Sequence, residues 1–442
     1  MTPRTIFVLA PTRSTYSPVL VLFFATGLAA VANFITQIVL ARTLGPDQFG
    51  AFFSALAIAT FLAPLAGFGL SGLWLRVFGE EGYSAQRWMP ASLFFVTLSA
   101  IIVVSLLFLW AWIGPHPPLK KSLLIILSGV TLAHCVIDLV GSKFQLEGKY
   151  QKLAIWQLTS HPLRLFGILL VLLVTPELTV YDTTLIFLIV SAIICLLGAY
   201  QLRHLFSGNY VLEGHIKSVE IKSESSRRLS KPSLIQVFKA ATPFGLEGFL
   251  FVVYYQTDII VLSYLTNNAE SGLYSVATVV MSAACLLPSV AYQQYLLPKF
   301  HRWAYSEGVE MAKKTRLGSI QMFLVGTLVM ILIFITAGPL VPAVFGSSYQ
   351  SSVTLLQILA IAIPFRYLNT HLGSILKTRD FIWTSVKATF FTAALNVVLN
   401  FVLISQYGTF GAAVATLTSY IVLSILFLLS ASKSLTQDIK ST

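Results

Sequence analysis

Residues 37–55, QIVLARTLGPDQFGAFFSA, are echoed by residues 259–277, IIVLSYLTNNAESGLYSVA. In each copy an apolar stretch runs into a short polar turn, and a glycine then opens the next apolar stretch. Gly50 aligns with Gly272, an offset of 222 residues that is about half of the chain. A repeat at half length indicates two related halves. In an apolar chain this arrangement is typical of secondary transporters.

The composition indicates a membrane protein. Of the 442 residues 56% are hydrophobic and 10% are charged, whereas soluble globular domains carry about 25% charged residues. Apolar runs of about 20 residues recur along the chain, and each is long enough to cross a bilayer as a helix. A β-barrel would instead show short alternating strands. We therefore expect an all-α polytopic membrane protein.

Twelve apolar stretches are predicted to span the membrane. They lie at about 18–40, 50–73, 90–113, 119–141, 153–174, 182–204, 240–264, 272–297, 317–337, 352–376, 385–404 and 411–431. A long polar segment, 205–239, separates the sixth span from the seventh. We therefore expect an N-terminal lobe (1–204), a cytoplasmic linker (205–239) and a C-terminal lobe (240–442).

The distribution of positive charge predicts the orientation. Of the 29 Lys and Arg residues, 24 fall in the N-terminus, the even-numbered connections and the C-terminal tail. Three fall in the odd-numbered connections and two lie inside spans. Such an excess marks cytoplasmic loops, so we expect both termini in the cytoplasm. It also accounts for the net charge of +12, and we expect no nucleic-acid partner.

The sequence shows no sign of an enzyme. It contains no GxxxxGK[ST], HExxH, GxSxG or CxxC motif, and the longest outer loop, about 338–351, is short. Cys135, Cys195 and Cys285 fall inside apolar runs without metal-ligand spacing, which predicts neither a metal site nor a disulfide framework. We expect no catalytic residues and no cofactor. Energy for transport would come from an ion gradient, the membrane potential or substrate flux.

Five charged residues lie inside the predicted spans, namely Asp138, Arg164, Glu247, Asp258 and Arg366. A charge at the bilayer centre costs about 2.5–3.5 kcal/mol on insertion scales, and such residues usually face a wet interior. The two arginines, one in each half, lie about 15 Å from a membrane face at the helical rise. Guanidinium groups favour phosphate and carboxylate. The arginines therefore suit an anionic headgroup, and the alternative is pairing with the internal carboxylates.

Polar residues at helical spacing extend these positions into stripes. His161 accompanies Arg164, Asn369 accompanies Arg366, and Asn33 and Gln37 form a polar zone nearer the outside. The candidate substrate-binding residues are Arg164, Arg366, His161, Asn369, Asn33 and Gln37. Intramembrane carboxylates often relay protons or ions. The candidate coupling or counter-ion residues are Asp258, Glu247 and Asp138.

Three segments resemble one known family. They are LARTLGPDQFGAFFSALAIATFLAPLAGFGLSGLWLRVFG (40–79), TDIIVLSYLTNNAESGLYSVA (257–277) and YGTFGAAVATLTSY (407–420). In this order they resemble the polysaccharide-biosynthesis flippases of the O-antigen flippase type, within the multidrug/oligosaccharidyl-lipid/polysaccharide exporter (MOP) superfamily. The resemblance covers nearly the whole chain and agrees with twelve spans.

The resemblance implies two six-helix lobes around a central cavity that opens alternately to each side. The implied substrate is a polyprenyl-pyrophosphate-linked oligosaccharide, such as a lipopolysaccharide O-antigen or exopolysaccharide repeat unit. It would move to the outer leaflet of a bacterial inner membrane. Membrane lipid, a polysaccharide polymerase and chain-length machinery are the implied partners.

Three other functions stay open at the level of sequence. They are a cation-coupled drug exporter of the same superfamily, a lipid-linked peptidoglycan precursor flippase and a membrane-bound polymerase or ligase. The peptidoglycan precursor flippases usually have two further helices. The half-length repeat and the short loops weigh against the polymerase.

Overall fold

The computed structural model describes residues 16–175, 177–213, 230–286, 308–376 and 382–441. Within these ranges, every long secondary-structure element is an α-helix. In chain order they are α1 (Tyr16–Phe61), α2 (Leu70–Glu81), α3 (Met89–Ile113), α4 (Pro118–Leu146), α5 (Tyr150–Val174), α6 (Val180–Phe206), α8 (Leu234–Leu265), α9 (Asn268–Ala284), α12 (Gly308–Phe345), α13 (Ser352–Ile361), α14 (Ile363–Leu376) and α15 (Ile382–Ser441). Short 3₁₀ turns cover Ala63–Leu65 (η1), Gly82–Trp88 (η2) and Ser347–Tyr349 (η5).

These helices account for the predicted spans. Seven described stretches are long and apolar enough to cross a membrane, and the bent pair α13–α14 would make an eighth. Residues 21–113 contain three predicted spans and residues 383–431 contain two. The remaining predicted span, 272–297, begins as α9, and its end lies outside the described residues. The predicted all-α polytopic fold with about twelve spans is therefore confirmed.

Two glycines turn the chain back on itself at one end of the bundle. Gly45 breaks α1 with a φ of 69° and a ψ of 172° and is followed by Pro46. Gly408 breaks α15 with a φ of 56° and a ψ of −132°. Positive φ values favour glycine because it has no Cβ. Each long helix is therefore a pair of spans, and we call the end with these turns the hairpin end.

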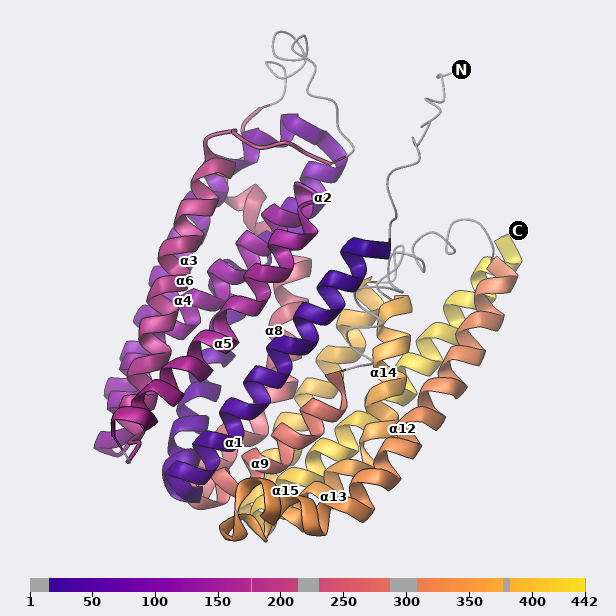
Figure 1. Ribbon diagram of the computed structural model, residues 1–442. Helices are drawn as coiled ribbons and strands as arrows, with labels where there is room; N and C mark the ends of the chain where they lie inside the picture. The colour runs from indigo at the N-terminus through magenta and orange to yellow at the C-terminus, as the bar shows by residue number, and fades with distance from the viewer. Residues whose placement is uncertain (1–15, 176, 214–229, 287–307, 377–381, 442) are drawn as a thin grey trace.

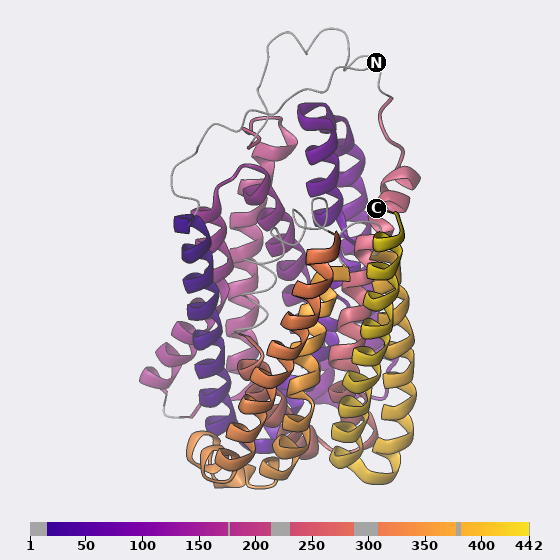
Figure 2. The ribbon, with the colours of Figure 1, turned by 90° about the vertical axis from the view of Figure 1, so that its right-hand side faces the viewer.

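The other end of the bundle is the terminal end, where α1 begins and α15 ends (Figures 1 and 2). Helices α1–α6 form one group and α8–α15 form the other. Figure 1 shows the outer helices of the two groups well separated toward the terminal end and close together at the hairpin end. The fold therefore has a closed end and an end at which the two groups diverge.

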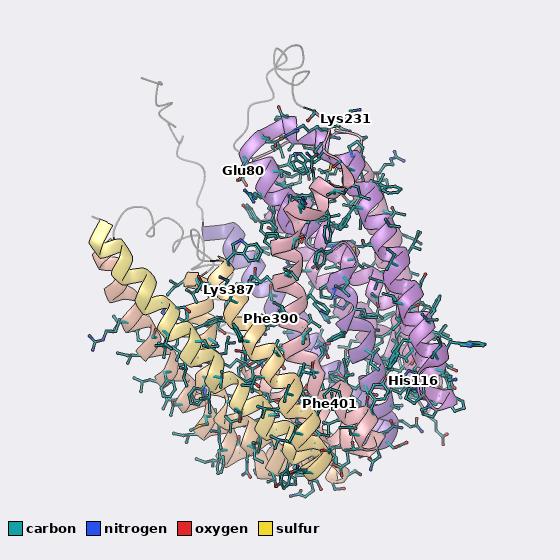
Figure 3. The ribbon with its side chains drawn as sticks, turned by 180° about the vertical axis from the view of Figure 1, so that it is seen from behind. Glu80, His116, Lys231, Lys387, Phe390 and Phe401 are labelled. Atoms are coloured by element: carbon teal, nitrogen blue, oxygen red, sulfur yellow. The ribbon has the colours of Figure 1, made fainter. Side chains whose placement is uncertain are left out.

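The side of the bundle is apolar and the terminal end carries charge (Figure 3). Phe390 and Phe401 of α15 are each 54% exposed along the flank. Glu80, Lys231 and Lys387 lie nearer the terminal end. An apolar flank with charged residues gathered at one end is the expected surface of a helix bundle in a bilayer.

The two copies of the sequence repeat contact each other at the hairpin end. A Cβ added to Gly50 would collide with the carbonyl oxygen of Asn268 and the amide nitrogen of Gly272. A Cβ added to Gly272 would collide with the carbonyl oxygen of Pro46. The contact is reciprocal, and only glycine lets the two backbones approach this closely. The repeated turns thus join the two halves of the chain.

Polar contacts support this junction. Arg42 donates hydrogen bonds from Nε to the Val344 carbonyl at 2.7 Å and from Nη2 to the Ala343 carbonyl. These carbonyls belong to the last turn of α12, which leaves unpaired acceptors like any helix C-terminus. The hydroxyl of Tyr349 donates to the Ala41 carbonyl at 3.0 Å. Arg42 therefore caps a helix of the opposite half.

A second close contact lies nearer the middle, where the predicted span 50–73 is broken. Here α1 ends, η1 follows, and α2 begins after Gly69, which has a φ of 76°. Gly69 faces the backbone of Ala241 and Gly245 on α8, and Phe68 stacks on Phe238 with ring centroids 5.7 Å apart. The break in the span thus places a turn of the first half directly against α8.

We predict that Gly50→Ala and Gly272→Ala each lower thermal stability. The added methyl group must push two backbones apart, and overpacking costs about 1–3 kcal/mol. Gly27→Ala is the matched control, because no atom lies within 4 Å of its added Cβ. Thermal unfolding of the purified variants in detergent measures the effect. Equal melting temperatures for the Gly50 and Gly27 variants would contradict the contact.

We predict that the terminal end faces the cytoplasm. Lys231 is exposed near the terminal end, and Pro115 is exposed next to His116, which lies near the hairpin end (Figure 3). In a chain with Cys135, Cys195 and Cys285 replaced by Ala, Pro115→Cys should react with an impermeant maleimide in intact cells. Lys231→Cys should react only after permeabilisation. The reverse pattern would show that the charge distribution was misread.

Candidate functional site

Two cavities lie between the halves of the chain and meet at one arginine. The hairpin-side cavity has a volume of about 360 Å³ and is bounded by residues of α1, α8, α9, α14 and α15. The terminus-side cavity has a volume of about 510 Å³ and is bounded by α2, α8, α14 and α15. Tyr254, Arg366 and Tyr420 line both cavities. These three side chains therefore form the boundary between the hairpin-side and the terminus-side cavities.

Arg366 lies just after the 44° bend between α13 and α14. Its guanidinium carbon is 5.6 Å from the ring centroid of Tyr255 and 5.8 Å from that of Tyr420. Cation–π contacts of this kind stabilise a charge without using its hydrogen-bond donors. Among the described residues, no ion pair or hydrogen bond engages this guanidinium. Its N–H groups are therefore available to a ligand.

The boundary between the cavities is built from aromatic and amide side chains. Tyr254 and Tyr420 meet edge to face with ring centroids 5.0 Å apart. Asn369, one turn beyond Arg366, donates from Nδ2 to the Tyr420 carbonyl at 3.1 Å and accepts from the Ser424 hydroxyl at 2.8 Å. Asn369 therefore lines the terminus-side cavity while fixing α14 to α15.

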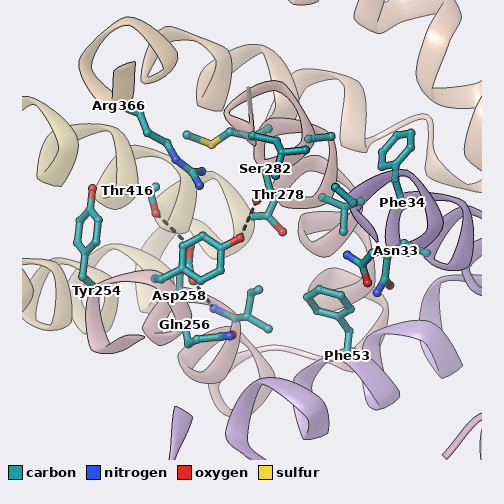
Figure 4. Close-up of a pocket in the computed structure, with 18 of the residues that line it drawn as sticks. Asn33, Phe34, Phe53, Tyr254, Gln256, Asp258, Thr278, Ser282, Arg366 and Thr416 are labelled. Atoms are coloured by element: carbon teal, nitrogen blue, oxygen red, sulfur yellow. Dashed lines mark hydrogen bonds between the residues drawn. The ribbon is translucent and has the colours of Figure 1, made fainter. Parts of the chain in front are cut away.

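Asp258 is buried in the wall of the hairpin-side cavity. Its carboxylate accepts hydrogen bonds from the Tyr274 hydroxyl at 2.6 Å, the Thr416 hydroxyl at 3.2 Å and the Ile259 amide at 2.8 Å. Ile259 belongs to α8, Tyr274 to α9 and Thr416 to α15; Figure 4 shows Asp258 with Thr416 beside it. The carboxylate thus joins three helices, and its hydrogen-bond partners are hydroxyl and amide groups.

Asn33 and Gln37 lie where the helical spacing predicts, on one face of α1 in the hairpin-side cavity. Figure 4 shows Asn33 across the cavity from Arg366. The Oε1 atom of Gln37 is buried and has no hydrogen-bond partner among the described residues. A polar ligand in this cavity would find unused acceptors and donors on α1.

Two further carboxylates lie toward the terminal end. Glu247 lines the terminus-side cavity. Asp138 lines an adjoining cavity of about 100 Å³, which shares Gly69 and Phe244 with the terminus-side cavity. Together these cavities place acidic groups on the path from the terminal end to Arg366.

Arg164 lies in a different place from Arg366. It is 7% exposed, and its guanidinium carbon lies 4.4 Å from the ring centroid of Phe187 on α6. Its neighbours include His161 and His134, close enough to interact electrostatically. Neither Arg164 nor His161 lines the two central cavities. In this conformation the two predicted arginines do not share a site.

The sequence did not single out several residues of the boundary. Tyr255 and Tyr420 hold the guanidinium of Arg366, and Tyr274 and Thr416 bind Asp258. Each lies in an apolar span, where an aromatic residue that faces a cavity has the same local pattern as one that faces lipid. Their role depends on which helices are neighbours, and the sequence pattern does not contain that information.

A family model described as a polysaccharide biosynthesis protein matches residues 17–304. The chain belongs to this family. It is 22% identical over 402 residues to an uncharacterized membrane protein of Methanocaldococcus jannaschii, covering 90% of this chain and 92% of the relative. It is also 25% identical over 213 residues to the probable low-salt glycan biosynthesis flippase Agl15 of Haloferax volcanii. This match covers 46% of this chain and 44% of the relative.

Solved structures show the same fold. A lipid II flippase, MurJ, in an inward closed conformation matches with a TM-score of 0.73 and 16% identity, over 93% of this chain and 87% of the other. An inward-facing multidrug resistance MATE transporter of the MOP superfamily matches with a TM-score of 0.65 and 14% identity. This match covers 94% of this chain and 95% of the other. The family model confirms the resemblance to the polysaccharide biosynthesis family, and these structures confirm the expected all-α fold with about twelve spans.

We predict that Tyr274→Phe destabilises the protein. The change removes the shortest hydrogen bond to the buried carboxylate of Asp258, and a lost bond to a buried polar group costs about 1–3 kcal/mol. Tyr407→Phe is the matched control, because Tyr407 is 62% exposed. Thermal unfolding in detergent should show a lower melting temperature for the Tyr274 variant alone. Equal values for both would show that the Asp258 cluster contributes little.

Proposed function

We propose that the protein is a flippase that moves a polyprenyl-pyrophosphate-linked oligosaccharide from the cytoplasmic to the outer leaflet by alternating access. The observation that carries the proposal is Arg366, whose guanidinium has no ionic partner in the described residues and is exposed to both central cavities. A charge is expensive at this depth unless it serves a ligand or a counter-ion. Membership of the polysaccharide biosynthesis family supports the proposal.

Recognition of the headgroup follows from the chemistry of the boundary. A guanidinium offers paired N–H donors that match two oxygens of a phosphate. Around it the terminus-side cavity presents Thr370, Ser374, Ser385 and Thr389, whose hydroxyl groups can hydrogen-bond to sugar hydroxyls. The pyrophosphate would bind Arg366, the sugars would occupy the wet cavities, and the lipid chain would stay in the bilayer.

The proposed direction of transport is supported by the closed hairpin end. The Gly50–Gly272 contact holds the halves together there, and the distribution of Lys and Arg favours a terminal end in the cytoplasm. The conformation described here would accept a headgroup from the cytoplasm. Parting of the repeated turns would then expose the hairpin-side cavity, with Asn33 and Gln37, to the opposite side.

The carboxylates are the proposed coupling groups. Asp258 is placed to bind a proton or a cation, since its partners Tyr274 and Thr416 can turn their hydroxyl groups between donor and acceptor roles. Glu247 and Asp138 lie on the terminal side of the boundary. Arg164 and His161 would join the site only after the first lobe rearranges.

The substrate class is proposed at the level of a lipid-linked glycan. One relative is named as a glycan biosynthesis flippase, and the structural match to a lipid II flippase supports transport of a lipid carrying a large headgroup. Within that class, an O-antigen or exopolysaccharide repeat unit in a bacterial inner membrane is the narrower proposal. A polymerase and chain-length machinery would then act on the product, and the protein itself would perform no chemistry.

We predict that Arg366→Ala lowers transport of a lipid-linked oligosaccharide in proteoliposomes by about tenfold to a hundredfold, because it removes charge-assisted hydrogen bonds worth about 1.5–3 kcal/mol. Arg366→Lys should retain part of the activity, since it keeps the charge and loses the planar donor pair. Arg76→Ala is the control, because Arg76 is exposed and pairs with Glu80 at 3.0 Å. Wild-type transport by a folded Arg366→Ala protein would contradict the proposal.

The structural match to a MATE transporter keeps a second function in view, that of a cation-coupled drug exporter. That function predicts essential carboxylates and a dispensable Arg366. Loss of drug resistance on Asp258→Asn, with resistance retained on Arg366→Ala, would favour the exporter over the flippase.

A further inference from the structure

A separate cavity lies away from the central ones, at the terminal end between α4, α5 and α6. Its volume is about 300 Å³, and Lys143, Lys149, Lys152 and Glu147 line it together with polar side chains from the end of α6. The central site makes no use of these residues. They gather where α4 turns into α5, on the face of the bundle that carries most of the basic connections.

Positive charge exceeds negative charge in this cavity. Glu147 has a side chain only 3% exposed, and it is shared between Lys149 Nζ at 2.9 Å and Lys143 Nζ at 3.8 Å. Lys143 also donates to the Gln201 side-chain oxygen at 3.1 Å. Lys152 makes no ion pair among the described residues. One buried carboxylate therefore faces three ammonium groups, which leaves an excess of two positive charges.

The other acidic group at this turn does not neutralise the cavity. Glu213 accepts a hydrogen bond from the Tyr150 hydroxyl at 3.2 Å and contacts Gly148, and it is absent from the cavity lining. His204 also lines the cavity and packs edge to face on Tyr200, with ring centroids 5.4 Å apart.

The start of α5 adds to the same field. Lys149 is its N-cap, no side chain caps the helix, and the first turn contains no acidic residue. Uncapped amide groups at a helix N-terminus carry a partial positive charge and bind anions. The cavity therefore combines ammonium groups, one of them on the buried Lys143, with a helix N-terminus that lacks its usual acceptor.

We propose that this cavity binds a phosphate-bearing anion, of the kind that an acidic phospholipid carries in its headgroup. Apolar surface continues from the cavity along the same helices, with Ile155 of α5 at 66% exposure and Leu197 of α6 at 48%. A lipid could thus place its phosphate among the lysines and its chains against this surface. Basic pockets between membrane helices bind acidic lipids in this way. The site does not depend on the proposed transport function.

Native mass spectrometry of the purified full-length chain with phosphatidylglycerol tests the proposal. Lys149→Ala/Lys152→Ala should weaken retention of one lipid about thirtyfold, given the contribution of two basic residues near the surface. Lys231→Ala/Lys239→Ala is the matched control, because it removes two exposed charges outside the cavity. Lys149→Arg/Lys152→Arg should restore binding. Phosphatidylcholine should bind weakly to every variant.

A competition experiment with inorganic phosphate identifies whether the cavity binds free phosphate or a lipid headgroup. Inorganic phosphate is added to both proteins. If it displaces phosphatidylglycerol from the wild type, and does not displace the lipid that stays bound to Lys149→Ala/Lys152→Ala, the cavity accepts free phosphate. If displacement fails while the lysine dependence holds, the occupant is a lipid headgroup. Equal retention of phosphatidylglycerol by the two double-alanine variants, both folded, would overturn the proposal.

Discussion

The contact between Gly50 and Gly272 is the constraint on which the rest of the structure depends. Each glycine accepts the backbone of the other half at a distance that no side chain allows, and Arg42 adds hydrogen bonds to the end of α12. The halves are joined at the hairpin end, and the turn at Gly69 packs against α8 nearer the middle, so the outer helices diverge toward the terminal end. The two central cavities lie between the halves, with Arg366 at their boundary.

The second constraint is the stabilisation of charged side chains inside the helix bundle. Asp258 is satisfied by hydroxyl and amide groups, and Arg366 is held over two tyrosine rings. Both arrangements stabilise a charge without an ion pair between them. In the proposed mechanism, Arg366 at the boundary of the two chambers would bind an anionic headgroup that reaches it from either side as the lobes move.

The sequence predicted the fold well and the site in part. Spans follow from hydropathy because a bilayer requires long apolar helices. The half-length repeat indicated two related halves, and the structure adds that the two repeated turns contact each other. Helical spacing placed Asn33 and Gln37 correctly on one face. The same rule gave Arg164 a similar stripe, yet that residue packs against Phe187 inside the first lobe. The spacing of residues along a helix defines which of them share a face. Tertiary packing then determines whether that face lies against a cavity or against another helix.

Access to residue 366 from the two sides of the membrane is the most direct test of alternating access. In a chain with Cys135, Cys195 and Cys285 replaced by Ala, Arg366→Cys can be labelled in oriented proteoliposomes with impermeant maleimides added on one side at a time. We predict labelling from both sides. Cross-linking that locks the hairpin end should abolish the reaction from that side alone. Reaction from one side only, whatever the state of the hairpin end, would contradict this prediction.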